Sequence, residues 1–229
     1  MKVRPFLCNS VLSLVFFFTL PIRAEVSDAD LAPIQNWLQF QRGIRTVAAE
    51  FVQMRELRTL RNPLRSEGKV WIDRKRERFR WQSGSEDSPK AVAVKSGDTL
   101  TLMQPSRKRA RQVDLGDAAG DPAGAAFDFA AGDLPDSLAD LKTAFSIEKL
   151  DSESGAWRLT LRPLQEKLRE SVAEIVFVID AERFFLRGFE MTFRDRSVVK
   201  TTFTRQEFNL DLDDSLFEPD LSSYTLDKS

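Results

Sequence analysis

The chain has 229 residues, of which 42% are hydrophobic and 30% are charged, a composition typical of a folded globular protein. It contains no histidine and a single cysteine, which excludes Ser-His-Asp and Cys-His catalysis, disulfide frameworks and thiolate zinc sites. The composition therefore favours a binding protein over an enzyme, and we expect no cofactor and no metal. The mildly acidic balance, with a formal net charge of −1, argues against a nucleic-acid partner.

The first 24 residues have the features of a cleaved secretory signal peptide. Lys2 and Arg4 are basic, residues 11–20 form an apolar run, and Ala24 is a small residue of the type that signal peptidases accept. A membrane-spanning helix needs about 20 apolar residues, more than this run supplies. Cys8 precedes the apolar run, whereas lipidation requires the reverse order. We expect residues 1–24 to be removed and residues 25–229 to form one soluble, unlipidated domain.

A first amphipathic helix is predicted over residues 28–41. Ser27 and Asp30 have the spacing of a capping box, and Gly43 stands where a glycine commonly ends a helix. The apolar positions that share one helical face are Leu31, Ile34 and Leu38.

From residue 46 onward, apolar residues recur with a period of two, which predicts β-strands. Turn-forming residues separate these alternating segments at hairpin spacing, as in the Ser96-Gly97-Asp98 run. The sequence predicts about ten antiparallel strands, over residues 47–53, 69–73, 79–81, 92–94, 100–102, 157–161, 173–179, 184–193, 198–205 and 208–212.

The strand pattern is interrupted in the middle of the chain. Asp121-Pro122 resembles a helix start, and the segment that follows is rich in Ala and Gly. A helix is then predicted over about 135–145. An apolar stripe of this kind is more often ordinary core than a lid, but the glycines before it would serve as hinges, and we expect residues 122–145 to form a mobile lid. The stripe comprises Leu134, Leu138, Leu141 and Phe145, and the hinges Gly120, Gly124 and Gly132.

The predicted strands 173–179 and 184–193 are apolar on both faces, so both faces must be covered. One interpretation is a well-packed sandwich core. The other is a curved sheet around an apolar cavity, the arrangement in which β-barrels hold lipids. On the second interpretation, the period-two residues that line the cavity are Phe51, Phe79, Trp81, Leu102, Phe177, Phe189, Met191, Phe193 and Phe203.

Other chemical patterns are weak. Carboxylate pairs such as Asp213-Asp214 are expected by chance among 35 acidic residues, and no phosphate-binding glycine loop is present. Two basic clusters, at residues 74–76 and at residues 107–109 with Arg111, fall in predicted hairpin turns. They are either solvated loops or patches that approach anionic lipid headgroups or an acidic protein.

Six short motifs in order resemble the family of the periplasmic outer-membrane lipoprotein carrier LolA. The resemblance covers essentially the whole chain after residue 24. The motifs are Phe51-Val52-Gln53, residues 64–72 with the Gly68 and Trp71 pair, residues 78–81, residues 96–105, residues 157–163, and Phe217-Glu218-Pro219.

This resemblance implies a mainly β fold, an incomplete antiparallel β-barrel of about eleven strands closed by a helical lid. It implies a monomeric periplasmic chaperone that shields lipoprotein acyl chains without covalent chemistry. The partners would be an inner-membrane ABC lipoprotein exporter and an outer-membrane lipoprotein receptor. Alternatives are a periplasmic lipid or lipoprotein sensor of the same fold, a carrier of another lipid, and an unrelated β-rich hydrolase that uses carboxylates.

In the family, a basic residue after the strand tryptophan is held to bond the lid and keep the empty cavity shut. Counting forward from Trp71 places Arg74 at this position, whereas counting back from Phe79 places Lys75 there. The assignment of the lid latch therefore stays open between these two neighbours.

Overall fold

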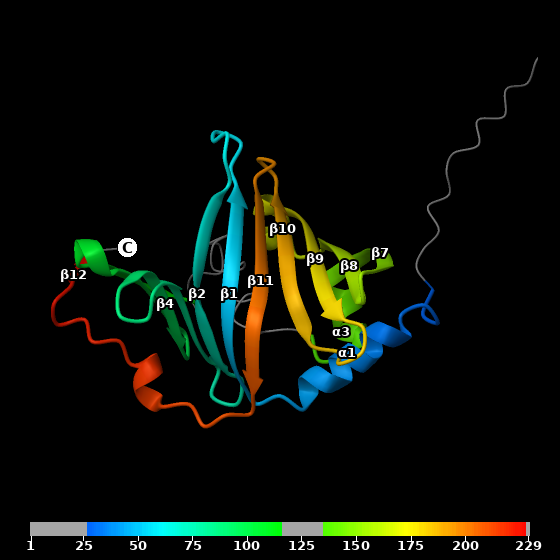
Figure 1. Cartoon of the computed structure of the whole chain (residues 1–229), viewed down its shortest axis with the longest axis horizontal. Helices are drawn as coiled ribbons and strands as arrows, with labels where there is room; N and C mark the ends of the chain where they lie inside the picture. The colour runs from blue at the N-terminus through cyan, green and yellow to red at the C-terminus, as the bar shows by residue number, and fades with distance from the viewer. Residues whose placement is uncertain (1–26, 116–134, 228–229) are drawn as a thin grey trace, which may run out of the picture.

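The structure, a computed structural model, describes residues 27–115 and 135–227 and shows a strongly curled, open antiparallel sheet with helices on its inner side (Figure 1). The described residues form a twelve-stranded sheet, so the expected mainly β, incomplete barrel is confirmed. The expected cleavable segment, residues 1–24, lies outside the described residues, as do Gly120, Gly124, Gly132 and Leu134.

The strands follow one another mostly as hairpins, with helices inserted near the start and in the middle of the chain. The helices are α1 (Ala32–Arg42), α3 (Leu138–Ala144) and α4 (Glu166–Ser171), with short 3-10 turns η1 (Pro105–Arg107) and η2 (Asp214–Phe217). The strands are β1 (Thr46–Glu56), β2 (Leu64–Asp73), β3 (Arg78–Gly84), β4 (Pro89–Ser96), β5 (Thr99–Gln104), β6 (Arg109–Asp114), β7 (Phe145–Glu153), β8 (Ala156–Pro163), β9 (Val172–Asp180), β10 (Leu186–Phe193), β11 (Val198–Phe208) and β12 (Thr225–Asp227).

The order of strands across the sheet is β12-β6-β5-β4-β3-β2-β1-β11-β10-β9-β8-β7. Neighbours are antiparallel except β12, which runs parallel to β6. The long pairing of β1 with β11 joins the two halves of the chain, and its register shifts between Glu50 and Phe51. Such bulges increase local twist and help a sheet to curl.

Helix α1 is shorter at its start than the sequence predicts. Ser27 and Asp30 form a turn ahead of the helix, in which the Asp30 N–H donates to the Ser27 carbonyl oxygen at 3.0 Å. The helix itself begins at Ala32, with Pro33 in its first turn, and Gly43 is its C-cap as expected. The predicted helix over 135–145 is likewise limited to α3, because Phe145 has extended backbone angles and begins β7.

Three other predictions about the strands are wrong. Phe184 has a positive φ of 57°, so β10 begins only at Leu186. Residues 208–212 are not a separate strand, because β11 runs on to Phe208 and Asn209 turns the chain with φ 59°. The basic residues Arg109 and Arg111 do not lie in a hairpin turn; they belong to β6.

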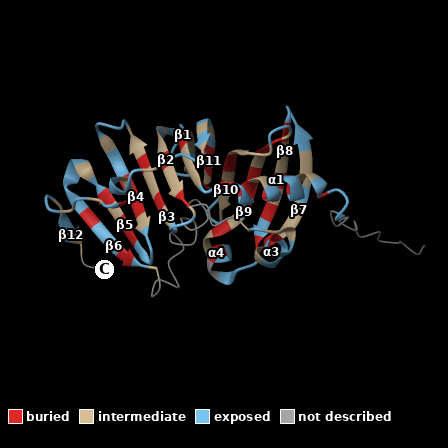
Figure 2. Ribbon diagram, turned by 90° about the horizontal axis from the view of Figure 1, so that it is seen from below, coloured by how far each residue is buried: buried red, intermediate tan, exposed pale blue. Residues whose placement is uncertain are grey.

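The two halves of the sheet are covered on different faces (Figure 2). On the concave side, α1 and α3 pack on β7–β10 in the largest core cluster, where Trp37 and Phe177 have ring centroids 5.3 Å apart. On the convex side, the segment after β11 covers β4–β6, with Phe217 of η2 buried against these strands. The concave face of β3–β6 therefore stands apart from the helices of the described chain.

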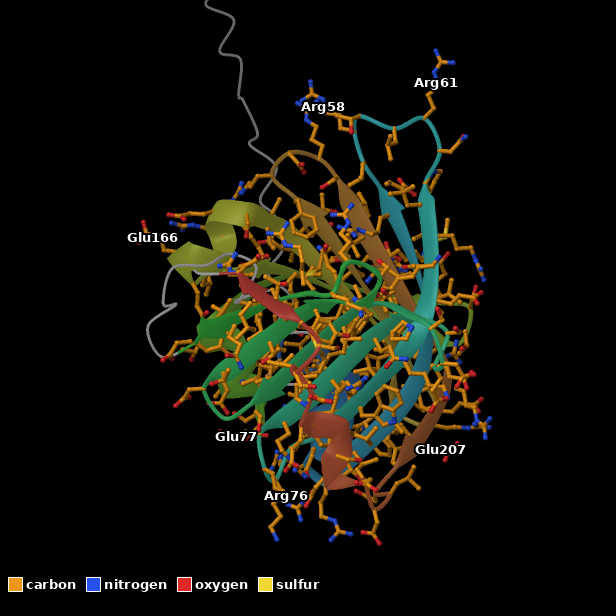
Figure 3. All side chains as sticks on the ribbon, turned by 90° about the vertical axis from the view of Figure 1, so that its left-hand side faces the viewer. Arg58, Arg61, Arg76, Glu77, Glu166 and Glu207 are labelled. Atoms are coloured by element: carbon orange, nitrogen blue, oxygen red, sulfur yellow. The ribbon has the colours of Figure 1, made fainter. Side chains whose placement is uncertain are left out.

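Ionic contacts hold the segment after β11 in place. The guanidinium of Arg78 donates to Asp214 at 2.8 Å and lies 4.5 Å above the Phe217 ring. Arg76, labelled near η2 in Figure 3, pairs with the same carboxylate at 2.6 Å. These two arginines lower the pKa of Asp214, with the hydrogen bond from Arg78 as the largest cause. The late Phe-Glu-Pro motif thus has a structural role, since Phe217 anchors the segment that closes the convex face.

Candidate ligand-binding cavity

A cavity of about 850 Å³ lies within the curl of the sheet. This volume is at the upper end of the range of roughly 300–1,000 Å³ that is typical of small-molecule sites. Its apolar lining comes from strands of both halves of the chain and comprises Leu64, Trp81, Ala91, Ala93, Leu102, Phe189, Met191, Phe193 and Val199. Val92, Met103 and Ala110 also border it, although they belong to the convex cluster with Phe217. Its polar and charged lining comprises Gln53, Arg55, Arg65, Ser66, Ser83, Lys90, Gln104, Arg107, Arg109, Arg111 and Asp227.

The strand register explains why these side chains meet. Trp81, Ala93, Leu102 and Arg111 are direct cross-strand partners on β3, β4, β5 and β6, so they form one row on one face. Leu64, Arg55, Val199 and Met191 form a second row on β2, β1, β11 and β10. The curl of the sheet brings the two rows onto the same cavity.

Five of the nine predicted cavity residues lie on the cavity wall. These are Trp81, Leu102, Phe189, Met191 and Phe193. They come from β3, β5 and β10, strands that are far apart in the sequence.

The other four predicted residues, Phe51, Phe79, Phe177 and Phe203, are not part of the wall. Phe51, Phe79 and Phe177 are at most 2% exposed and belong to the packed core. Phe51 lies beneath Trp81, and Phe177 lies beneath Trp37 of α1, so larger aromatic rings cover them. Phe203 is half-buried between the two core clusters. Period two assigns a residue to a face, but it does not show which part of that face is covered.

The described part of the predicted lid covers the other half of the concave face. Leu141 is fully buried and Phe145 is 5% exposed, and both belong to the core cluster under α1 and α3, with Leu138 packed against it. Helix α3 also contacts the turn before α1 through an ion pair between Lys142 and Asp28. Residues 122–134 of the expected lid lie outside the described residues.

Arg74 lies next to the end of α1. Arg74 is the first residue after β2, and its Nη1 donates a hydrogen bond to the Gln41 carbonyl oxygen at 2.9 Å. Gln41 stands in the last turn of α1, where carbonyl groups lack intrahelical partners. Lys75 is exposed. The geometry thus places Arg74, of the two candidates, against a helix that packs on the concave face.

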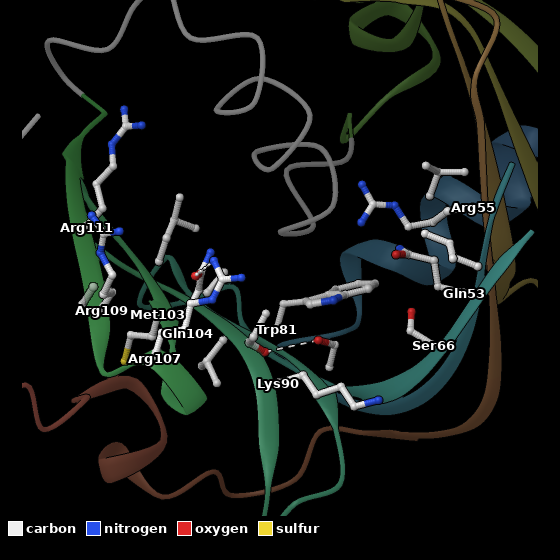
Figure 4. A pocket seen from close by; sticks show the side chains of 18 of the residues that line it. Gln53, Arg55, Ser66, Trp81, Lys90, Met103, Gln104, Arg107, Arg109 and Arg111 are labelled. Atoms are coloured by element: carbon white, nitrogen blue, oxygen red, sulfur yellow. Dashed lines mark hydrogen bonds between the residues drawn. The ribbon is translucent and has the colours of Figure 1, made fainter. Parts of the chain in front are cut away.

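Positive charge gathers around the cavity, a feature that the strand pattern alone does not predict. Six Lys or Arg side chains and one carboxylate, Asp227, line it. Figure 4 shows Arg55 on one side and Arg107, Arg109 and Arg111 on the other, with the Trp81 ring between them. Arg109 pairs with Asp227 at 2.6 Å, and the hydrogen bond that it donates to this carboxylate raises the pKa of Arg109. The hairpin of β5 with β6 brings Arg109 and Arg111 to the cavity, since Arg111 pairs with Leu102 of the cavity wall.

The arrangement is suited to binding an amphipathic molecule. The wall near Trp81 is apolar and basic side chains lie beside it, which suits a ligand with an apolar body and a polar end. The described residues contain no group of three or more His, Cys, Asp or Glu placed to hold a metal ion. Within residues 27–115 and 135–227, no helix combines the length and the apolar character needed to cross a membrane.

Comparison with known proteins gives the fold and the family. A structure described as an uncharacterized conserved protein from Thermus thermophilus is similar over 84% of this chain and 97% of its own, with a TM-score of 0.52 and 9% identity. A LolA superfamily protein from Nitrosomonas europaea matches 80% of this chain and 96% of its own, with a TM-score of 0.40 and 11% identity. At 9% identity, the likeness to the Thermus thermophilus structure shows the fold alone. No curated protein sequence matches the chain.

The family profile described as outer membrane lipoprotein carrier protein LolA matches residues 42–220. This match covers more than half of the chain and runs from the end of α1 to the segment that closes the convex face. It includes the strands that form the cavity and Arg74. The chain therefore belongs to the LolA family of outer membrane lipoprotein carrier proteins.

Proposed function

We propose that the protein is a periplasmic carrier that binds the acyl chains of lipoproteins in the cavity and transports them from the inner to the outer membrane. The observation that supports this proposal most directly is the apolar wall around Trp81, in the curled sheet of a LolA-family chain. Transfer of acyl chains needs no covalent chemistry, in keeping with a chain that has no histidine.

The physical basis is burial of hydrocarbon. Each methylene group removed from water contributes about 0.8 kcal/mol, so the acyl chains of a lipoprotein gain several kcal/mol from an apolar cavity. Met191 is flexible and Phe189 has a flat ring, so together with Leu102 they can adapt to acyl chains in different conformations. The apolar lining thus suits cargo proteins that share only their lipid.

Release of the cargo is favoured when the closed, empty state of the protein is stabilised relative to the open, cargo-bound state. On the proposed route, the cargo comes from an inner-membrane ABC exporter and passes to an outer-membrane lipoprotein receptor. The bond from Arg74 to the end of α1 would act as the lid latch, since it stabilises the closed, empty state. One charged hydrogen bond contributes about 1.5–3 kcal/mol, enough to bias transfer while leaving the opening reversible.

Filling the cavity provides the test. Ala91 is exposed and lines the cavity, so Ala91→Trp places an indole in the space proposed for acyl chains. Ala139 is an exposed residue of α3 outside the cavity, and Ala139→Trp is the matched control. Both variants are added to inner-membrane vesicles that hold the exporter and a labelled lipoprotein, and lipoprotein released into solution is measured.

We expect the wild-type protein and Ala139→Trp to release the lipoprotein equally, and Ala91→Trp to release at least tenfold less. Mass spectrometry of the protein purified from periplasm should show a bound acylated molecule for the first two only. Equal release by the two tryptophan variants would contradict the proposal.

A further inference from the structure

The cavity carries more positive charge than an acyl chain requires. Of its six basic side chains, Arg109 pairs with Asp227 and Arg65 pairs with Glu67. The other four, Arg55, Lys90, Arg107 and Arg111, form no ion pair with a carboxylate of the described residues. The chain as a whole has a net charge of −1, so this concentration of positive charge is local.

Each of the two rows that build the cavity places a guanidinium beside its apolar wall. Arg111 follows Leu102 in the row that starts at Trp81, and Arg55 lies between Leu64 and Val199 in the other row. Arg107, at the end of η1, lies on the same side as Arg111 and lines the same cavity (Figure 4). The cations therefore face the cavity from two sides rather than one exposed edge.

These side chains are exposed, so solvent screens their mutual repulsion in part, and an anion between them lowers what remains of it. Arginine binds phosphate through two parallel hydrogen bonds, so several arginines around one opening favour a phosphate group. A cargo that consists of acyl chains alone gains nothing from these charges. A lipid with a phosphate headgroup matches both parts of the lining.

We propose that the cavity selects a lipid with a phosphate-bearing anionic headgroup, attracted by Arg55 from one side and by Arg107 and Arg111 from the other, while its acyl chain lies against Trp81 and Leu102. This inference rests on the proposed acyl-chain site and extends its ligands from the acyl chains of lipoproteins to free lipids with a phosphate headgroup. It also brings into one site the basic residues 107–111, for which the sequence left open a solvated loop or a lipid-headgroup patch.

The test compares two soluble lipids with the same chains, short-chain phosphatidic acid and short-chain diacylglycerol, by equilibrium binding to the purified protein. The first variant combines Arg55→Gln, Arg107→Gln and Arg111→Gln. The control combines Arg42→Gln, Arg45→Gln and Arg183→Gln, three exposed residues outside the cavity lining, and removes the same number of charges. Thermal unfolding checks that both variants fold.

We expect wild type and control to bind phosphatidic acid at least tenfold more tightly than diacylglycerol. The cavity variant should lose this preference and keep its affinity for diacylglycerol. Raising the salt concentration should weaken only the binding of phosphatidic acid.

Three results would overturn the proposal. The first is equal affinity of the wild type for the two lipids. The second is a cavity variant whose affinity falls equally for phosphatidic acid and for diacylglycerol. The third is inorganic phosphate that binds the wild type as tightly as phosphatidic acid does. Sedimentation with anionic vesicles without uptake of lipid would also overturn it, because the charges would then serve a membrane surface. Binding of neither lipid would instead contradict the acyl-chain site itself.

Discussion

The Trp81 indole stacks on the Phe51 ring, with ring centroids 3.9 Å apart and 29° between the planes. Phe51 is 2% exposed and forms part of the core, whereas Trp81 lines the cavity. Two residues that the sequence assigns to one face thus differ in depth. Phe51 supports the wall, and Trp81 is the surface that a ligand meets.

This difference in depth predicts different effects of truncation. Phe51→Ala should lower the free energy of unfolding by about 3–5 kcal/mol, because it leaves a hole in packed core. Trp81→Ala should cost less stability, since the ring is half-buried, and should weaken binding of an acyl-chain probe at least tenfold. Urea unfolding and equilibrium binding measure the two effects. A Trp81→Ala variant that binds like the wild type would remove Trp81 from the site.

Gly68 makes the stacked pair possible. It is the cross-strand partner of Phe51, and a Cβ there would lie 2.6 Å from the Phe51 ring and closer still to the Gln82 carbonyl oxygen. We expect Gly68→Ala to destabilise the protein by about 1–3 kcal/mol, because backbone and ring must both move. Gly43→Ala is the control: its nearest contact is 3.4 Å and its φ is −77°, so it should change stability by less than about 0.5 kcal/mol. Similar melting curves for both variants would show that the close approach is not a constraint.

The bond from Arg74 to the Gln41 carbonyl leads to a prediction about transfer. Arg74→Leu should still take up lipoprotein from inner-membrane vesicles but deliver it to the outer-membrane receptor roughly tenfold more slowly, because release no longer restores the bond. Lys75→Leu should behave like the wild type, since Lys75 is exposed. The rates of uptake and delivery are measured separately. Wild-type delivery by Arg74→Leu would exclude a latch at this position.

Acid should destabilise the turn between β9 and β10. Burial raises the pKa of Asp180, but hydrogen bonds from the backbone N–H groups of Arg183 and Glu182 and from the Arg187 guanidinium outweigh it, so the pKa is lowered. A lowered pKa in the folded state contributes stability above the unfolded value of about 4, and this contribution is lost as the pH falls through the folded pKa.

Asp180→Asn should therefore be less stable than the wild type at pH 7, with the difference shrinking as the pH falls below about 4. Asp87→Asn, at an exposed position in the turn between β3 and β4, is the control and should follow the wild type. Urea unfolding across this pH range measures the difference. A pH-independent gap between Asp180→Asn and the wild type would mean that the charge of Asp180 is not the cause.

Much of the fold could be predicted because local patterns carry it. The period of two in the chain from residue 46 onward indicates antiparallel strands, and the predicted apolar stripe is buried, with Leu31 at the N-cap of α1 and Ile34 and Leu38 within it. Sequence reasoning misses strand β6 because only Ala110 and Val113 of its six residues are buried, so it shows no apolar alternation. The three-residue β12 is too short to leave a pattern.

The site is harder to predict than the fold. The apolar part could be found in outline, because Trp81, Leu102 and Phe189 fall at inward positions of their strands. The position of the charged residues depends on which strands face one another across the cavity of the curled sheet. Arg55 and Arg111 belong to β1 and β6, far apart along the chain, and the sequence alone gives no reason to place them around one space.

The most direct test of a lipid-binding cavity is to identify the molecules that its wall contacts in the cell. A photo-crosslinking amino acid, p-benzoylphenylalanine, is introduced at Leu102 on the cavity wall and, as a control, at exposed Thr202 on β11, outside the cavity lining. After irradiation, mass spectrometry identifies the molecules attached at each position. A lipid-binding cavity should give adducts that contain acyl chains at position 102 and none at position 202. The absence of acylated adducts at position 102, or equal amounts at both positions, would contradict a lipid-binding cavity.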